Sequence, residues 1–493
     1  MRRAVVLLLV ASLAGCMVGP DYRRPAAPTP DAFGEIAPIP SPRADGKPPE
    51  TSVPVPGGIP EAWWEAFGDP LLASLVTRTV ASNLDLAQAE ARVRQARAQR
   101  GIVAADLYPQ IGASGSYTRE RTSANAPGFA EGQTLNLFQT GFDADWEIDV
   151  FGGIRRGVES AEATIGATLA DRDAILISLM GEVGREYVTY RSLQQRIRLA
   201  NENLKSQEAT LALTQRLFDA GLAAELDVQR AAAQVSTTAA TIPILVQQRE
   251  QSMHALGILV GALPMTLQAE LEPVGPIPVP PTSVGVGMPS DLLLRRPDVA
   301  RSERRLAAAT ANIGVATRDL FPRFFLVGAA GLESIAASDL FTWQSRAASI
   351  GPRITWPVFQ GGRIRANIRL QDAAQEEAFA AYQQTVLRAF QDVEDSLVAF
   401  SGAQAQRAQL EDAVRANKRA TDLARRLYAQ GLTDFLDVLV AEQALFTSED
   451  TLAQSKRDVA LGLVSLYKAL GGGWETDAAA TASARASADV DTE

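Results

Sequence analysis

Two stretches of the chain place hydrophobic residues every three or four positions, over lengths that far exceed an ordinary globular helix. The residues of the first stretch are Leu176, Leu179, Val183, Tyr187, Tyr190, Leu193 and Ile197, and those of the second are Phe379, Tyr382, Val386, Phe390, Val393, Leu397 and Phe400. This heptad-like spacing predicts long helices in left-handed coiled packing. Because no proline occurs from Arg363 to Ala429, a continuous helix there would reach on the order of 100 Å at 1.5 Å per residue.

Ahead of each long helix the period changes to two, which indicates β-strands. One face is apolar and the other acidic, since Phe138, Thr140, Phe142, Ala144, Trp146 and Ile148 alternate with Gln139, Gly141, Asp143, Asp145, Glu147 and Asp149. Residues 111–118 and 348–356 alternate in the same way, whereas 324–332 is apolar on both faces and is assigned as a strand from its place in the chain. A soluble hairpin also alternates, but the strands of a transmembrane barrel need this pattern.

The chain is internally duplicated, with copies that start near Ala62 and Leu292. Four landmarks recur in one order: Asp85 to Gly101 against Asp298 to Gly314, Asp106 to Pro109 against Asp319 to Pro322, WEIDVFGG against WPVFQGG, and LFDAGLAAELDV against LYAQGLTDFLDV. Each copy predicts a helix, two strands, a very long helix and a further helix. We place the first repeat at 61–270 and the second at 271–474. Four strands cannot close a barrel, and an open edge in lipid would leave backbone groups unpaired, so the chain is predicted to oligomerise.

The first sixteen residues contain, in sequence order, the parts of a lipoprotein signal peptide. A cationic head at Arg2 and Arg3 precedes an apolar run too short to span a bilayer, which closes with the lipobox-like Leu13-Ala14-Gly15-Cys16. We therefore expect residues 1–15 to be a signal peptide and Cys16 to carry the acyl chains that anchor the mature protein. Residues 16–60 are rich in proline and predict an extended segment without a core of its own, and residues 475–493 predict a disordered tail.

Composition narrows the function classes. The net charge of −10 argues against a nucleic-acid partner. One cysteine allows no intrachain disulfide, and the one histidine, His254, lies in a helical stretch without neighbouring ligand candidates. We expect no metal, no cofactor and no catalytic residues, because neither a nucleotide-binding motif nor a nucleophile–base set occurs.

With these features in place, the sequence resembles the TolC-like outer-membrane factors, in particular the lipidated NodT-type branch that serves resistance-nodulation-division pumps. The resemblance covers nearly the whole mature chain. Its specific pieces are CMVGPDY at 16–22, RRPD at 295–298, GPRITWPVF at 351–359, and the duplicated turns at Gly221 and Gly431. It implies a homotrimer with a twelve-stranded transmembrane β-barrel and a long periplasmic α-helical barrel, which conducts substrates passively from an inner-membrane pump and a periplasmic adaptor.

The resemblance also implies the functional residues. The adaptor would dock on the turns Gly221-Leu222 and Gly431-Leu432, where glycine supplies the left-handed backbone of a tight turn. Asp437 of each subunit would line a narrow periplasmic gate, and Tyr428 would hydrogen bond to Asp227. The sequence departs from the family pattern at Val440 and Thr433, where a second ring aspartate and a latch arginine can occur.

Two other readings stay open on the sequence alone. A lipid-anchored periplasmic adaptor or coiled-coil envelope protein would also have long helices, although it would not show the duplicated helix–strand–helix order. A cell-envelope enzyme would need a convergent catalytic set. The sequence does not predict the transported substrate, the cognate adaptor and pump, or whether the gate is closed at rest.

Overall fold

The computed structural model describes residues 17–27, 29–34, 52–55, 57–121, 123 and 134–473. The predicted signal peptide, Cys16 and the predicted tail at 475–493 lie outside this range. The chain forms two compact units, each described by itself: Met1–Ala26, Ala91–Leu169 and Arg301–Gln384 form unit 1, and Ala27–Glu90, Ala170–Ala300 and Thr385–Glu493 form unit 2.

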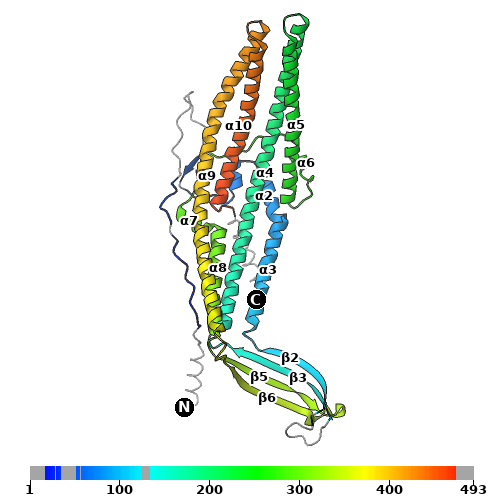
Figure 1. The fold of residues 1–493 in the computed structure, drawn as a ribbon, viewed down its shortest axis with the longest axis vertical. Helices are drawn as coiled ribbons and strands as arrows, with labels where there is room; N and C mark the ends of the chain where they lie inside the picture. The colour runs from blue at the N-terminus through cyan, green and yellow to red at the C-terminus, as the bar shows by residue number, and fades with distance from the viewer. Residues whose placement is uncertain are drawn as a thin grey trace. The chain divides into compact units, whose positions relative to one another are not determined.

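The predicted duplication is visible in the order of the elements (Figure 1). The first repeat contains α2 (Pro70–Ser82), α3 (Leu84–Ala105), β2 (Gln110–Arg121), β3 (Thr134–Ile148), α4 (Gly153–Asp219) and α5 (Glu225–Leu259). The second contains α7 (Pro289–Arg295), α8 (Pro297–Arg318), β5 (Arg323–Ser334), β6 (Arg346–Thr355), α9 (Arg363–Ala429) and α10 (Phe435–Ala469). The shorter elements are β1 (Val53–Val55), η1 (Trp63–Phe67), α6 (Gln268–Leu271), β4 (Ser283–Gly285), η2 (Ala337–Asp339) and η3 (Trp343–Ser345). The long helices α4 and α9 each have 67 residues, and α5 and α10, which follow them, each have 35. These helix pairs therefore match in length between the two repeats.

The single helix predicted ahead of each hairpin is wrong, because two helices stand there. In the first repeat Asn83 ends α2 in an extended conformation, and its side-chain oxygen then accepts the backbone N–H groups of Asp85 and Leu86 at 2.8 and 3.1 Å. In the second repeat Arg296 is extended ahead of Pro297, since a residue that precedes proline is disfavoured in the helical region.

All four predicted strands are confirmed, and in unit 1 they form one antiparallel sheet in the order β2-β3-β5-β6. The register places Phe142 opposite both Ala113 and Ala330, so one face collects the apolar residues, as the alternation predicts. Near the middle of the sheet Gly141 pairs with Gly331. A Cβ atom on Gly331 would lie 2.4 Å from the backbone oxygen of Thr140, so the two strands approach too closely for any side chain at this point.

Hydrophobic residues that the sequence places every three or four positions along the long helices contribute to the core of unit 2. Val183, Tyr187, Val393 and Phe400 have no exposed surface. Tyr187 donates a hydrogen bond to Asp69 at 2.7 Å. Burial, reinforced by this hydrogen bond, raises the pKa of Tyr187 far above its usual value. Among the described residues, no helix combines the length and the apolarity needed to cross a membrane.

The described parts of the segment 16–60 are more structured than the sequence predicts. β1 pairs in parallel with β4 of the linker between the repeats, with Val53 opposite Ser283. Phe33 and Ile59 are buried, and Gln404 Oε1 accepts the backbone N–H of Ser52 at 2.7 Å. The segment has no core of its own, but it supplies side chains to the core of unit 2.

Candidate functional site

The two turns that join successive helices in unit 2 have the same geometry. Gly221 and Gly431 have φ angles of 72° and 71°. In each turn the N–H of the following leucine returns to the leucine five residues earlier, Leu222 to Leu217 at 2.7 Å and Leu432 to Leu427 at 2.9 Å. This hydrogen bond is the signature of a Schellman motif, in which a left-handed residue ends the helix. No atom outside the turn lies within 4 Å of the position that a Cβ atom would take on either glycine, so the glycines are there for their backbone angles.

Each turn presents a pair of exposed leucines spaced four residues apart. The side chains are 76% exposed at Leu222, 57% at Leu226, 67% at Leu432 and 50% at Leu436. Val440 adds a further exposed apolar residue on α10, at 59%. Since an exposed apolar cluster that recurs at equivalent places is typical of an interaction surface, these turns are candidate docking sites.

Asp437 lies in the first turn of α10 and is exposed. The hydroxyl of Thr433 donates a hydrogen bond to its carboxylate. The Asp437 side chain is therefore held by a neutral hydroxyl group on the preceding turn.

The predicted hydrogen bond between Tyr428 and Asp227 is wrong for this conformation of the chain. The hydroxyl of Tyr428 is buried and has no hydrogen-bond partner among the described residues, while Asp227 lies 3.8 Å from Arg230. The Tyr428 ring packs against Phe435 at 5.6 Å between centroids, and both belong to an apolar cluster that also contains Ala231 and Val438. Burial, helped by the charge of Asp227, raises the pKa of Tyr428. This apolar packing holds the tyrosine in place.

A buried polar network beside this cluster was missed by the sequence analysis. Glu442 of α10 is 5% exposed, and its Oε1 accepts Thr210 Oγ1 at 2.6 Å and Arg425 Nε at 2.8 Å. Arg425 also donates to Ser206 Oγ at 2.6 Å. The network joins α4, α9 and α10, and removal of one partner would leave a buried charge unpaired, which is costly. A glutamate on a helical pattern gives no sign of this role in the sequence.

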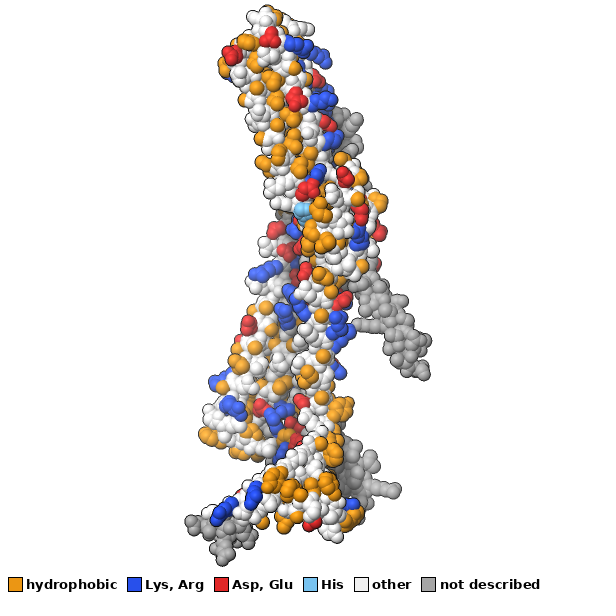
Figure 2. Space-filling view, turned by 90° about the vertical axis from the view of Figure 1, so that its right-hand side faces the viewer, with side chains coloured by type: hydrophobic (Ala, Val, Ile, Leu, Met, Phe, Trp, Pro, Cys, Tyr) orange, Lys and Arg blue, Asp and Glu red, His pale blue; other side chains and the backbone are white. Residues whose placement is uncertain are grey.

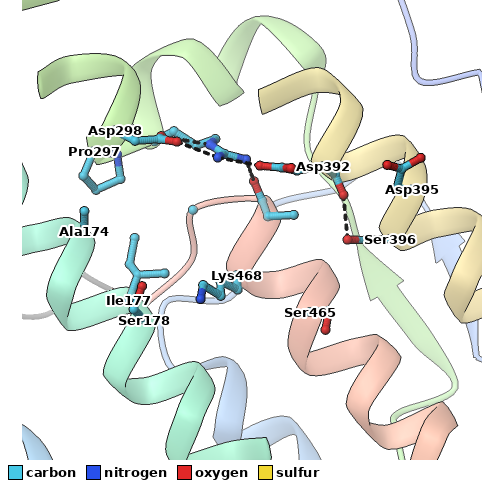
Figure 3. Close-up of a pocket in the computed structure, with 13 residues that line it drawn as sticks. Ala174, Ile177, Ser178, Pro297, Asp298, Asp392, Asp395, Ser396, Ser465 and Lys468 are labelled. Carbon is cyan, nitrogen blue, oxygen red and sulfur yellow. Dashed lines mark hydrogen bonds and ion pairs between the residues drawn. The ribbon is translucent and has the colours of Figure 1, made fainter. Parts of the chain in front are cut away.

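A second polar cluster in unit 2 lies at the RRPD motif, residues 295–298. It lies beside a cavity of about 450 Å³. Figure 3 shows Asp298, Asp392 and Lys468 converging on it from three helices. Arg296 donates to Asp298 at 2.6 Å, to Asp392 at 2.8 Å and to the backbone oxygen of Ala469 at 3.0 Å. Burial alone would lower the pKa of Arg296, but these acceptors hold it above its ordinary value. The motif therefore ties α8, α9 and α10 together.

The two faces of the sheet in unit 1 differ in chemistry. Phe142, Ile350 and Ile354 on the apolar face are 65%, 81% and 62% exposed, and Figure 2 shows hydrophobic side chains gathered on the sheet. The opposite face carries Asp143, Asp145, Glu147 and Glu333, and Arg353 pairs with Asp145 at 2.6 Å. Such a sheet is stable only if its apolar face leaves water.

The residues that follow Cys16 are held in unit 1 by one buried guanidinium. Arg156 is 2% exposed, and it donates to Asp21 at 2.7 Å, to Glu159 at 2.7 Å and to the backbone oxygen of Val18 at 3.1 Å. Tyr22 donates to the carboxylate of Glu303. Burial by itself would raise the pKa of Glu303, but hydrogen bonds from Arg304 and Tyr22 hold it below its ordinary value. Cys16 itself lies outside the described residues.

Among the described residues, no group of three or more His, Cys, Asp or Glu side chains is placed so that it could hold a metal ion. The buried carboxylates Glu442 and Glu303 are bonded to arginines and hydroxyl groups.

Comparison with known proteins gives a consistent result. The family model "Outer membrane efflux protein" matches residues 75–262 and 288–472. The chain is 33% identical over 420 residues to the pyoverdine export outer membrane protein OpmQ of Pseudomonas aeruginosa, covering 84% of this chain and 88% of OpmQ. It is 32% identical over 471 residues to the outer membrane protein OprJ of the same species, covering 95% of each. The solved structure of the outer-membrane channel OprN superposes with a TM-score of 0.86 at 36% identity, covering 93% of this chain and all of that one.

Proposed function

The chain belongs to the outer membrane efflux protein family and is an outer-membrane exit channel of an efflux pump rather than an enzyme, and we propose that three copies close one continuous duct. The fold is the TolC-like one, with repeats of helix, hairpin and long helices. Its relatives include the outer membrane proteins of a solvent and a toluene efflux pump, which supports the proposal that this chain works with a periplasmic adaptor and an inner-membrane pump. The trimer and the residue roles below are proposals.

The observation that carries the trimer is the open sheet. Among the described residues, the edge strands β2 and β6 each lack a second neighbouring strand, and the apolar face of the sheet is exposed. In lipid both edges would leave backbone groups unpaired, a cost of several kcal/mol for each group. Pairing of β6 with β2 of the next copy removes both edges at once, and three copies of a four-stranded sheet give twelve strands. The acidic face then lines the water-filled interior.

The helical turns are proposed to bind the periplasmic adaptor. Leu222 and Leu432, with the leucines four residues after them, expose equivalent apolar pairs, and the shared turn geometry presents both pairs in the same way. Three copies would offer six such pairs. An adaptor that carries an apolar helical end would fit them, since removal of exposed apolar side chains from water is favourable.

The periplasmic gate is proposed to be a ring of Asp437 side chains. Each carboxylate is fixed by Thr433 and remains exposed, so symmetry would concentrate negative charge at the axis and favour cations. Asp227 and Tyr428 lie in the same region, and Tyr428 contributes apolar packing there. The buried network at Glu442 supports the helices behind the gate.

Cys16 is proposed to carry the lipid, and residues 1–15 to be removed. The segment from Val18 to Tyr22 is fixed to unit 1, the unit that contains the sheet. A lipid on Cys16 would therefore be attached next to a firmly held segment. We retain the boundaries 16–60, 61–270 and 271–474 for the anchor segment and the two repeats.

An unboiled gel of the detergent-extracted protein tests the proposed assembly. A trimer that falls to the monomer only on heating is expected, because the barrel strands would be paired around a closed ring. Purified trimer should also conduct ions in planar bilayers. A monomer without heating, or a trimer that does not conduct, would contradict the proposal, and a lipid-anchored adaptor would give the first of these results.

A further inference from the structure

The charged residues on the apolar face of the sheet are all of one kind. The register places Arg119 and Arg121 on the same face as Tyr117, and Arg346 on the same face as Leu332. Every other strand residue on this face is uncharged, whereas the carboxylates of the strands lie on the opposite face. Within the four strands the carboxylates are therefore confined to one face, whereas arginines occur on both: Arg323 and Arg353 lie on the acidic face.

The three arginines also share one end of the sheet. Arg121 is the last residue of β2 and Arg346 the first of β6, so both lie where the hairpins turn. The helices join the other end, since α3 precedes β2 and α9 follows β6. If the helices are periplasmic, as proposed, the arginines lie at the outer surface of the membrane. There a charged residue facing lipid costs only about 0–1 kcal/mol, against roughly 2–4 at the bilayer midplane.

These side chains are exposed and lack an acidic partner in the described residues. The part of the chain that the structure describes offers no ion pair to Arg119, Arg121 or Arg346. Arg346 stacks on the ring of Trp343, 2.9 Å from its centroid, and Tyr117 packs on Phe138 at 4.7 Å. Aromatic residues of this kind mark the interface between a bilayer and water. A cation at that depth needs an anion from outside the protein.

Closure of the trimer would combine the arginines of two copies. β2 and β6 are the opposite edges of the sheet, so Arg346 of one copy would approach Arg119 and Arg121 of the next across the seam. Guanidinium groups bind phosphate through two parallel hydrogen bonds, which makes arginine the side chain suited to such an anion.

We propose that Arg119, Arg121 and Arg346 form a phosphate-binding belt for the phosphorylated glycolipid of the outer leaflet. The belt contains three equivalent sites, one at each seam between copies, and it rests on the proposed trimeric barrel. Bound lipid bridges neighbouring copies at the outer surface. The positive charge of the belt is opposite in sign to that of the acidic interior face.

Native mass spectrometry of the full-length trimer in detergent, with added diphosphoryl lipid A, tests this proposal. The combined variant Arg119→Gln, Arg121→Gln and Arg346→Gln should bind the lipid at least about tenfold more weakly, because each charge-assisted hydrogen bond to phosphate contributes about that factor or more. Lipid A stripped of both phosphates should bind the wild type as weakly. A control with Arg365→Gln, Arg369→Gln and Arg388→Gln removes the same charge from exposed positions of α9 and should bind diphosphoryl lipid A like the wild type.

The outcomes separate this proposal from the assembly on which it rests. An intact trimer with equal lipid binding in the belt variant and the wild type overturns the belt alone. Competition by millimolar inorganic phosphate without any effect of the acyl chains would show a free-phosphate site and also overturn it. A wild-type protein that gives no trimer in the same spectra overturns the proposed assembly, whatever lipid it binds.

Discussion

At the scale of single residues, several carboxylates of this protein are held by hydroxyl groups. Thr433 holds Asp437, Thr210 holds Glu442 and Tyr22 holds Glu303. A hydroxyl fixes the position of a carboxylate without cancelling its charge, whereas an arginine would do both. Glu442 and Glu303 are bonded to an arginine as well. The difference therefore matters most at Asp437, since the proposed gate would select by charge and needs the charge to remain.

Replacement of Asp437 by asparagine should change selectivity and leave the channel assembled. Three charges leave the proposed ring, while an amide oxygen can still accept the Thr433 hydroxyl. We expect a lower preference for cations and about tenfold weaker block by hexamminecobalt, measured from reversal potentials and current block in planar bilayers. Asp434→Asn removes the same charge one turn earlier on an exposed residue and should behave like the wild type. Equal selectivity in all three proteins would place the aperture elsewhere.

The attachment of the N-terminal segment should depend on pH through Glu303. Because the pKa of Glu303 lies below its ordinary value, its stabilisation is complete above the unfolded pKa of about 4.3 and is lost as the pH falls through the lowered one. Hydrogen exchange at residues 18–22, corrected for intrinsic rates, should be flat above about pH 5 and rise in stronger acid. In Glu303→Gln the rise should be absent and exchange faster throughout by roughly tenfold. Glu162→Gln, which breaks an exposed pair with Arg100, should keep the wild-type profile.

At the scale of elements, glycines meet different constraints in the turns between helices and in the strands of the sheet. The turn glycines Gly221 and Gly431 have open space around them and are required for their backbone angles. Gly141 and Gly331 have ordinary angles but no space, since each faces the backbone of the other strand. The same residue type therefore serves two purposes, and only the structure distinguishes them.

Gly331→Ala should weaken the sheet. The added methyl group would meet the backbone oxygen of Thr140 at 2.4 Å and Gly141 Cα at 2.8 Å, and overpacking of this kind costs about 1–3 kcal/mol. The trimer should dissociate at a lower temperature on semi-native gels. Gly351→Ala is the matched control, because it lies in the same sheet with nothing within 4 Å of its Cβ position. Equal melting of both variants would show that the strands separate at this point in the membrane.

The paired leucines of the turns should be needed for the adaptor. Leu222→Asp together with Leu432→Asp puts charges where apolar burial is proposed, and should reduce co-purification of the adaptor from the native host by tenfold or more. Leu263→Asp alters a residue that is equally exposed, at 79%, outside the turns. Retention of the adaptor by the double variant, with the trimer intact, would move the docking site off the turns.

At the scale of the whole molecule, the sequence predicts the elements whose hydrophobic and polar residues alternate with a regular period. Hydrophobic residues every three or four positions predict the long helices, alternation with a period of two predicts the strands, and the duplication predicts their order. The 67-residue helix α9 covers the proline-free stretch over which a continuous helix was predicted. The features that were missed depend on residues far apart in the chain. The break at Asn83, the β1–β4 pairing and the partners of Glu442 leave no periodic trace, because each depends on one side chain or on a few backbone groups.

Cys16→Ser should separate anchoring from insertion. The variant should lose all acyl labelling, yet a closed barrel is itself stable in lipid, so the protein should still fractionate with the outer membrane as a trimer. Mass spectrometry of the mature wild type checks the first part, and an unmodified cysteine there would contradict the lipobox interpretation. Loss of the trimer in Cys16→Ser would show that the lipid is needed for assembly as well.

The contacts that attach the N-terminal segment also imply an order in which the parts of the chain fold. Tyr22, Ser52 and Gly34 bond to residues 281, 352 and 360 positions further along the chain. Contacts across such separations form late, because the entropy of closing the loop must be lost before the contact stabilises anything. The beginning of the chain, which is synthesised first, is therefore secured among the last, after both repeats have folded, and during that interval the N-terminal segment is free to be carried by other factors.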